Sequence, residues 1–144
     1  MPFCERLSEQ LAVVATIDPQ AGGTGALTTD VVAMGMHRRA LFILSNGAGT
    51  AGVTVAIQEA NAGFTAGTAT ILAGAATAVG VTANTQNLYE VSAEAMGAGL
   101  TALRGVFTST GADILSVVVL ADVERYHPAS DRDLATVLTI QAAN

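Results

Sequence analysis

With 144 residues, the chain is long enough for one domain with a sizeable apolar core, alone or with extended arms. Only 12% of the residues are charged, 12 acidic and 6 basic, and the net charge is −6. This balance argues against nucleic-acid binding, which needs clustered positive charge to neutralise phosphates. With so few charges, much of the surface must consist of small, neutral residues or be covered by other protein. We expect the second, because a monomer so poor in charge would tend to associate.

The N-terminal region gives two exclusions. Cys4 is the single cysteine, so an intrachain disulfide and a cysteine-based zinc site are excluded. Glu5 stands where a secretory signal needs a positive end before an apolar run, so no signal is predicted.

The uncharged stretch between Glu59 and Glu90 consists mainly of Ala, Gly and Thr, without the Leu, Ile and Phe density of a membrane span. We therefore expect no membrane partner.

Residues 1–27 are expected to form an N-terminal arm and a first strand. The spacing of Phe3, Leu7 and Leu11 is typical of a short helical turn over residues 3–12. Val13 to Ile17 is a candidate strand that ends at Asp18-Pro19. The segment either packs on its own domain or reaches a neighbouring subunit, and the sequence leaves both open.

The next residues predict two strands and a turn. Thr28 to Met34 is a predicted strand with Asp30 facing out, and Ala40 to Leu44 is a fully apolar run. His37 lies between them beside Arg38 and Arg39. These three side chains either bind an anion or cap the end of a strand at the surface, and we expect the second.

A glycine-rich loop follows, and it formally matches a nucleotide-binding fingerprint. Gly47 to Gly52 fits G-x-G-x-x-G, which requires a helix N-terminus directly after it to hold a pyrophosphate. Val53 to Glu59 instead alternates apolar and polar residues, which predicts a half-buried strand. The glycines are therefore interpreted as turn residues, and no cofactor is expected.

The middle of the chain is low in complexity and then alternates again. Extended pieces are expected around residues 70–72 and 79–82. In Leu88 to Ala95, the carboxylates of Glu90 and Glu94 share one side of the predicted strand. At about 13 Å apart in a strand, they are too distant for shared glycosidase chemistry, so a solvated edge is expected.

Two apolar strands joined by a tight turn are expected to form the centre of the fold. Leu100 to Thr108 carries Arg104 in its middle, and Ile114 to Val123 is almost unbroken aliphatic sequence. The second run is short, β-branched and bounded by turn residues, which favours a strand covered on both faces. The predicted fold is therefore all-β, an antiparallel β-sandwich of jelly-roll or Ig-like type over residues 28–128.

The C-terminal arm is assigned to residues 129–144. Its run from Leu134 to Ile140 either adds to the sheet edge of another subunit or forms the last strand of its own domain. The candidate interface residues at the two ends share an apolar side chain, and they are Phe3, Leu7, Leu11, Leu134, Val137 and Ile140.

The sequence predicts no catalytic or metal-binding residues. Neither His37 nor His127 has a metal partner at helix or strand spacing. Ser130, His127 and Asp131 could form a catalytic set only within one turn of chain, with nothing to build an oxyanion site. We expect no enzyme, no cofactor and no small-molecule substrate.

The order of these features resembles a family of small virion proteins of tailed bacteriophages. The resemblance rests on the strand from Val53 to Glu59, on Leu103-Arg104-Gly105-Val106 followed by Ser116 to Leu120, and on the ending Arg125 to Ser130. It runs from about Val31 to Ser130. Asn61-Ala62-Gly63 replaces the acidic, glycine-rich turn common in the family, and Leu103 stands where an aromatic residue is usual.

The resemblance implies a decoration, or cement, protein on the surface of the phage capsid, made in the host cytoplasm. Its partners would be the major capsid protein and copies of itself, with a trimer plausible. A tail-tube or head-tail connector component is the first alternative. A secreted carbohydrate-binding or adhesive sandwich is the second, although a chain with no Trp and two Tyr offers little for stacking on sugars.

Overall fold

The structure is a computed structural model that describes residues 10–22, 25–47, 52–65, 68–76, 85–109, 111 and 114–122. These residues form nine strands and one 3-10 helix, η1. The elements, in chain order, are β1 (Leu11–Ala21), β2 (Ala26–Thr28), β3 (Val32–Ala33), β4 (Arg39–Asn46), β5 (Val53–Ala60), β6 (Ala69–Ala76), β7 (Thr85–Ser92), η1 (Ala93–Ala95), β8 (Ala102–Ser109) and β9 (Ile114–Asp122).

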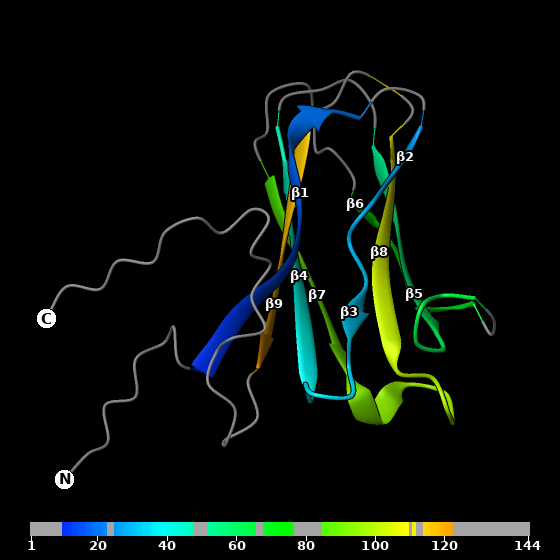
Figure 1. The fold of residues 1–144 in the computed structure, drawn as a ribbon. Coiled ribbons are helices and arrows are strands. Elements are labelled where there is room, and N and C mark those ends of the chain that lie inside the picture. Colours follow the sequence, from blue (N-terminus) through cyan, green and yellow to red (C-terminus); the bar gives the residue numbers. More distant parts are fainter. Residues whose placement is uncertain are drawn as a thin grey trace, which may run out of the picture.

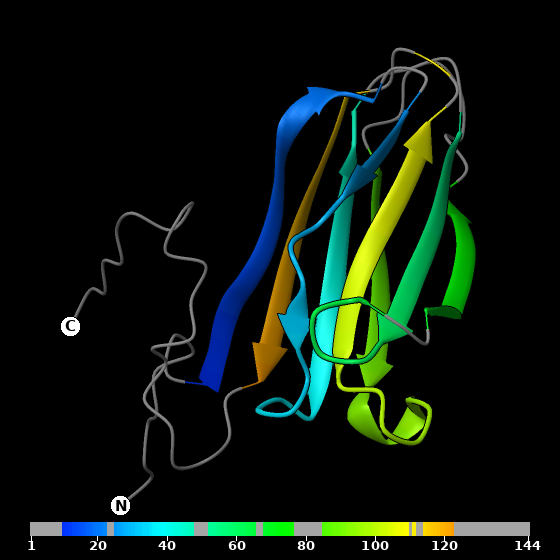
Figure 2. The ribbon, with the colours of Figure 1, turned by 45° about the vertical axis from the view of Figure 1, so that its right-hand side comes forward.

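The strands form two antiparallel sheets that face each other (Figures 1 and 2). Sheet A has the order β1-β9-β4-β7, and sheet B has the order β2-β8-β5-β6, with β3 also paired to β8. The predicted all-β antiparallel sandwich is confirmed. Because β2 and β3 pair in succession with β8, they act as one interrupted edge strand. Each sheet then has four strands in the order of a jelly roll, which decides between the two predicted topologies.

Between β2 and β3, one threonine continues the hydrogen bonding to β8. The backbone N–H of Thr29 donates to the carbonyl of Gly105 at 3.0 Å, and the N–H of Gly105 donates to Oγ1 of Thr29 at 2.9 Å. The hydroxyl thus replaces a missing backbone acceptor beside β8. The predicted single strand from Thr28 to Met34 is therefore two short strands, and Asp30 is exposed between them, as expected.

Alternation of side chains produces the core between the sheets. In β4, Ala40, Phe42 and Leu44 are buried while the residues between them are only half-buried. Gly105 is required at its place in β8, because a Cβ there would lie 2.5 Å from Cε2 of Phe107 and 3.2 Å from Cδ1 of Phe42. The largest fully buried side chains are Phe42, Phe107, Leu44, Ile57, Leu103 and Leu115.

The two strands expected at the centre do not pair with each other. β8 lies inside sheet B between β5 and the β2/β3 edge, whereas β9 lies inside sheet A between β1 and β4. Each is the centre of one layer, and the chain crosses from one sheet to the other between them. The expectation that β9 is covered on both faces is also wrong within this chain, since Val118 is 37% exposed and Ile114 is 53% exposed.

β1 is longer than predicted and irregular. It runs past the expected stop at Asp18-Pro19 to Ala21, and it pairs with β9 from Leu11 onward. Its register shifts between Val13 and Ala15 and again between Ile17 and Gln20. The second shift lets Pro19, which has no backbone N–H, sit in an edge strand. Strand pairing in the sandwich therefore starts before residue 28, where the predicted domain began.

Other predicted segments have mixed outcomes. The strands over Ala40 to Leu44, Val53 to Glu59 and residues 70–72 are confirmed within β4, β5 and β6. The strand predicted over Leu88 to Ala95 ends at Ser92, and η1 takes its last residues. Of the helical turn predicted over residues 3–12, the part up to residue 9 lies outside the described residues, Gln10 is helical, and Leu11 is already in a strand. The extended piece at 79–82 and the C-terminal arm also lie outside the described residues.

Candidate functional site

The outer face of sheet A is aliphatic across all four of its strands. Its side chains alternate with buried core residues and so point away from sheet B. Leu88 is 64% exposed, which makes it the most exposed of these side chains. We call this surface the aliphatic face, and it consists of Val13, Leu41, Ile43, Leu88, Val118 and Leu120.

The strand register places these six side chains next to one another. One row runs across β1, β9 and β4, because Leu120 is opposite both Val13 and Leu41. A parallel row runs across β9, β4 and β7, because Ile43 is opposite both Val118 and Leu88. Neighbouring side chains on one face of a sheet are close enough to form one continuous surface. At the β7 end of the first row, Glu90 is opposite Leu41, and its carboxylate pairs with Arg39.

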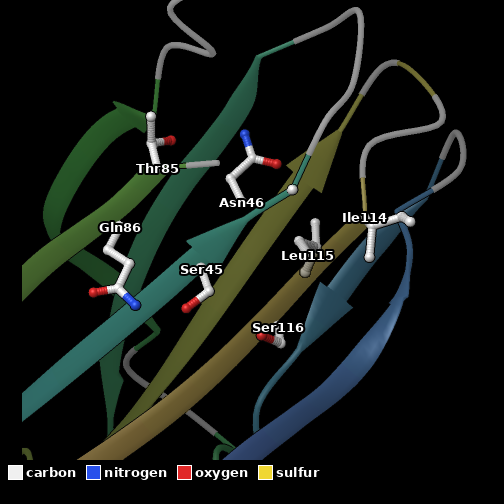
Figure 3. A pocket seen from close by; sticks show the side chains of 8 residues that line it. Ser45, Asn46, Thr85, Gln86, Ile114, Leu115 and Ser116 are labelled. Carbon is white, nitrogen blue, oxygen red and sulfur yellow. The ribbon is translucent and has the colours of Figure 1, made fainter. Parts of the chain in front are cut away.

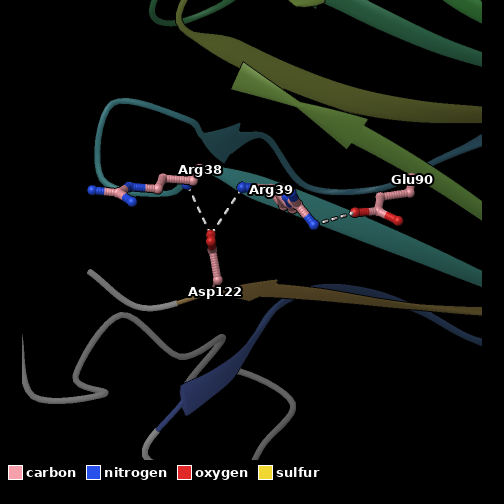
Figure 4. Close-up of polar contacts among 4 residues, drawn as sticks. All are labelled: Arg38, Arg39, Glu90 and Asp122. Atoms are coloured by element: carbon pink, nitrogen blue, oxygen red, sulfur yellow. Dashed lines mark hydrogen bonds and ion pairs between the residues drawn. The ribbon is translucent and has the colours of Figure 1, made fainter. Parts of the chain in front are cut away.

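Polar contacts bound the aliphatic face at the end where β9 finishes (Figure 4). The backbone N–H groups of Arg38 and Arg39 donate to Oδ1 of Asp122 at 2.8 and 2.9 Å. Nη1 of Arg39 lies 3.6 Å from Oε1 of Glu90, in an exposed ion pair. Such exposed pairs contribute little to stability. The two backbone donors fix the end of β9 against the start of β4.

His37 has a different position from the one predicted. It is only 5% exposed, and its Nδ1 lies 2.6 Å from the carbonyl oxygen of Asp122. His37 therefore connects the turn before β4 to the end of β9, as a cap would, but it does so in a buried position and not at the surface. Among the described residues, this turn binds one anionic group, the carboxylate of Asp122, through the main-chain N–H groups of Arg38 and Arg39.

At the opposite end of sheet A, a hollow of about 560 Å³ lies where β4 ends and β7 and β9 begin (Figure 3). Its described lining carries no charge, and it consists of Ser45, Asn46, Gly47, Thr85, Gln86, Ile114, Leu115 and Ser116. Ser45 is opposite both Gln86 and Ser116 in the sheet. A row of neutral hydrogen-bonding groups therefore crosses three strands beside the aliphatic face.

Unpaired polar atoms lie under this hollow. Asn46 is 2% exposed, and neither its Oδ1 nor its Nδ2 has a hydrogen-bond partner within the part of the chain that the structure describes. The same holds for Oγ1 of Thr85, which is opposite Asn46, and for Nδ2 of Asn87. Burial of an unpaired polar group costs about 1–3 kcal/mol. Among the described residues, this end of sheet A therefore offers donors and acceptors to a further hydrogen-bonding partner.

The outer face of sheet B has a different composition. Thr54 and Thr108 lie opposite each other in β5 and β8, and Ala56 lies opposite Val106. The next pair is Gln58 and Arg104, whose Nε donates to Oε1 of Gln58 at 2.9 Å. Along β5 and β8, small and neutral side chains thus adjoin one cation, while Asp30, which follows Thr29, lies level with Arg104 at the edge of the sheet.

The predicted interface residues can be placed only in part. Leu11 lies in β1, half-buried and opposite Asp122, at the margin of the aliphatic face. Phe3, Leu7, Leu134, Val137 and Ile140 lie outside the described residues, so their role stays a prediction. Sequence reasoning missed the aliphatic face, although the unbroken apolar run from Ala40 to Leu44 already indicates a strand that is apolar on both sides.

The described residues contain no group of three or more His, Cys, Asp or Glu side chains that could hold a metal ion. Burial raises the pKa of Tyr89 above its ordinary value of 10.0. In the described ranges, no helix has both the length and the apolar character to span a membrane.

Comparison with known proteins adds no relative. A scan of the sequence against models of protein families gave no match, and a search of curated proteins gave none at the significance required. The bacteriophage resemblance in the sequence therefore stays a prediction, and function has to be argued from the two outer faces.

Proposed function

We propose that this chain is a structural protein of a bacteriophage virion, a capsid decoration protein that stabilises the head by bridging major capsid subunits. The aliphatic face carries this proposal. It would pack on an uncharged surface of the shell subunit, bury its six side chains there, and perform no reaction.

The physical basis of attachment is apolar burial. Removing apolar surface from water contributes about 25 cal/mol per Å². The aliphatic side chains are already partly covered by their neighbours, so each one adds only part of its full burial energy. A single contact of this kind is modest, but many copies on one shell add up. None of the six side chains is charged, so docking has to desolvate an ion only where it also covers the Arg39–Glu90 pair at the border of the face.

Two further observations support the proposal. The jelly-roll strand order is one that viral capsid proteins use, although a fold alone does not define a function. The sequence also has the strand pattern, with a central arginine in β8, on which the bacteriophage resemblance rests. The partner must then present a surface as poor in charge as the aliphatic face.

A matched pair of substitutions tests the docking surface. Val118 is in the aliphatic face and is 37% exposed, whereas Val31 is 45% exposed and lies outside that face. Val118→Glu should strongly reduce the number of copies on source particles, measured by quantitative mass spectrometry and cryo-electron microscopy. Val31→Glu should leave that number unchanged. Equal occupancy of the two variants would exclude the aliphatic face as the docking surface.

The same preparations test the location of the protein. If the chain contributes no density to the shell, the decoration role is wrong. Hexameric rings or tubes in negative-stain images of the isolated protein would favour the tail-tube alternative instead. Deletion of residues 131–144 should leave the sandwich folded but lower occupancy, as expected of an arm that reaches a partner, and unchanged occupancy would contradict that role.

The neutral hollow favours a second candidate function, which is binding of an uncharged, hydroxyl-rich ligand such as a carbohydrate. Asn46 could supply both a donor and an acceptor, and Ile114 could supply an apolar wall. Titration of the isolated protein with a panel of neutral mono- and disaccharides, followed by amide chemical shifts, separates the two candidates. Saturable shifts at Ser45 and Ser116 would support the ligand, and no shifts would remove it.

A further inference from the structure

The cation on the outer face of sheet B is held in place from two directions. Arg104 is half-buried, and its Nε donates to Gln58, its register partner in β5. Its Cζ lies 4.5 Å from the centroid of the Phe64 ring, in cation–π geometry. One N–H and one face of the guanidinium are therefore fixed, which leaves the outer end of the planar group in a defined direction.

The turn that places Phe64 against the Arg104 guanidinium has a strained backbone conformation. Phe64 has a φ of 54°, in the left-handed region that is uncommon for a bulky residue. Its N–H donates to the carbonyl of Asn61 at 3.0 Å, and Oδ1 of Asn61 accepts from the N–H of Thr65 at 3.1 Å. Figure 2 shows this turn, directly after β5, in front of sheet B. Strain that the surrounding hydrogen bonds maintain is typical of positions with a binding role.

The rest of the guanidinium fork has no partner within the described residues. Arginine offers five N–H donors, and the four on its two Nη atoms remain after Nε has bound Gln58. In the described part of the chain, Arg39 forms an ion pair, with Glu90, whereas Arg104 forms none. A cation that is stacked, anchored and uncompensated is preorganised to bind an oxyanion through its two Nη groups.

We propose that Arg104 is a docking point for a carboxylate of a neighbouring protein subunit, bound end-on by its two Nη groups while Phe64 and Gln58 hold the guanidinium. Charge complementarity selects this occupant. Thr54, Ala56, Val106 and Thr108 are neutral and small, so one acidic side chain can approach closely. Asp30 lies level with Arg104 at the sheet edge but forms no ion pair with it in the described part of the chain. A nucleic acid is disfavoured, because a phosphate backbone needs many cations and the chain has a net charge of −6.

This inference rests on the proposed function only for the identity of the neighbour. If the aliphatic face docks on one subunit, the Arg104 site on the opposite sheet contacts another, and the sandwich links the two. The carboxylate-binding property itself belongs to the isolated chain. It can therefore be tested without any particle.

The first experiment titrates the isolated full-length protein with sodium acetate against sodium chloride at equal ionic strength, and follows the guanidinium resonances by NMR. Arg38, an exposed arginine of the same chain, serves as the internal reference. Preorganisation should make the apparent association constant for acetate at Arg104 at least about threefold higher than at Arg38. Phe64→Leu should reduce it to the reference level. Equal responses of Arg104 and Arg38 in the wild type would overturn the proposal.

The second experiment measures attachment to source particles. Arg104→Lys keeps the charge but loses the planar fork, and it should weaken binding by about tenfold. Arg39→Lys, at an exposed ion pair, is the control and should bind as the wild type does. Thermal unfolding of both variants checks that folding is unchanged. Wild-type binding that Arg104→Lys does not weaken would refute the Arg104 contact, whereas failure of the wild type to bind would refute only the proposed function.

Discussion

The two outer faces of this sandwich share one core but offer a partner opposite kinds of contact. Sheet A presents six aliphatic side chains in two adjoining rows, without a charge among them. Sheet B presents threonine, alanine and valine around a single anchored arginine. The first face can give affinity through area with little directional preference. The second can give orientation through one charged, geometrically defined contact.

The largest expected effect is on the free energy of unfolding and comes from a change in the core, on which both outer faces depend. Phe42 of sheet A is fully buried and lies near Gly105 of sheet B. Phe42→Ala should lower the free energy of unfolding by about 3–5 kcal/mol, because it deletes a buried ring and leaves a cavity. Urea denaturation measures it. A loss below about 1 kcal/mol would mean that the two sheets are not packed through this ring.

A substitution of Asp122, at the end of β9, should lower the local stability of sheet A alone. Asp122→Ala removes the acceptor of two backbone N–H groups at the start of β4, and should cost about 1–2 kcal/mol of stability. Asp122→Asn keeps an oxygen acceptor and should cost less. Amide exchange at Arg38 and Arg39 should rise in the alanine variant, while amides of β5 and β8 stay protected. Uniform loss of protection would contradict a local clamp.

The unpaired polar atoms under the hollow predict a gain instead of a loss. Asn46→Leu replaces an unpaired buried amide by an apolar side chain of similar size, and should stabilise the fold by about 1–3 kcal/mol. Asn46→Asp is the matched control and should destabilise it, because the described residues that line this hollow offer no cation to a buried carboxylate. If Asn46→Leu is destabilising, the amide has a partner in solution that satisfies it.

The smallest expected effect on stability concerns the aliphatic face itself. Val118→Thr and Val31→Thr are both surface changes of the same shape, and each should alter stability by about 0.5 kcal/mol or less. Only the first interrupts the continuous aliphatic surface. Hydrophobic-interaction chromatography should therefore show a clear drop in retention for Val118→Thr and little change for Val31→Thr. Equal retention would show that the face does not act as one surface.

The sequence predicts features that depend on neighbouring residues better than features that depend on residues far apart in the chain. Alternation over Val53 to Glu59 predicted β5 correctly, since the side-chain period of a strand is local. The crossing between sheets after β8 could not be predicted, because a turn does not reveal which strand its successor pairs with. For the same reason, Thr28 to Met34 was predicted as one strand, and the hydroxyl of Thr29 that bridges to Gly105 was not foreseen.

The candidate sites show the same limit. The sequence places Arg104 in the middle of a strand, and it predicts a turn at Asn61 to Phe64. The stacking of Phe64 on Arg104 depends on a left-handed backbone and on the register of β5 with β8, which no local pattern contains. The aliphatic face likewise needs four strands in one order. The strand over Ile114 to Val123 was expected to be covered on both faces, although every second side chain of β9 faces outward.

The irregular course of β1 also affects how copies of the sandwich can meet. A straight, fully hydrogen-bonding border strand is a template on which further chains can add without limit and form fibrils. Pro19 and the two register shifts make this border a poor template. Growth along that side is therefore disfavoured, which favours finite assemblies joined through broad surfaces over open-ended polymers.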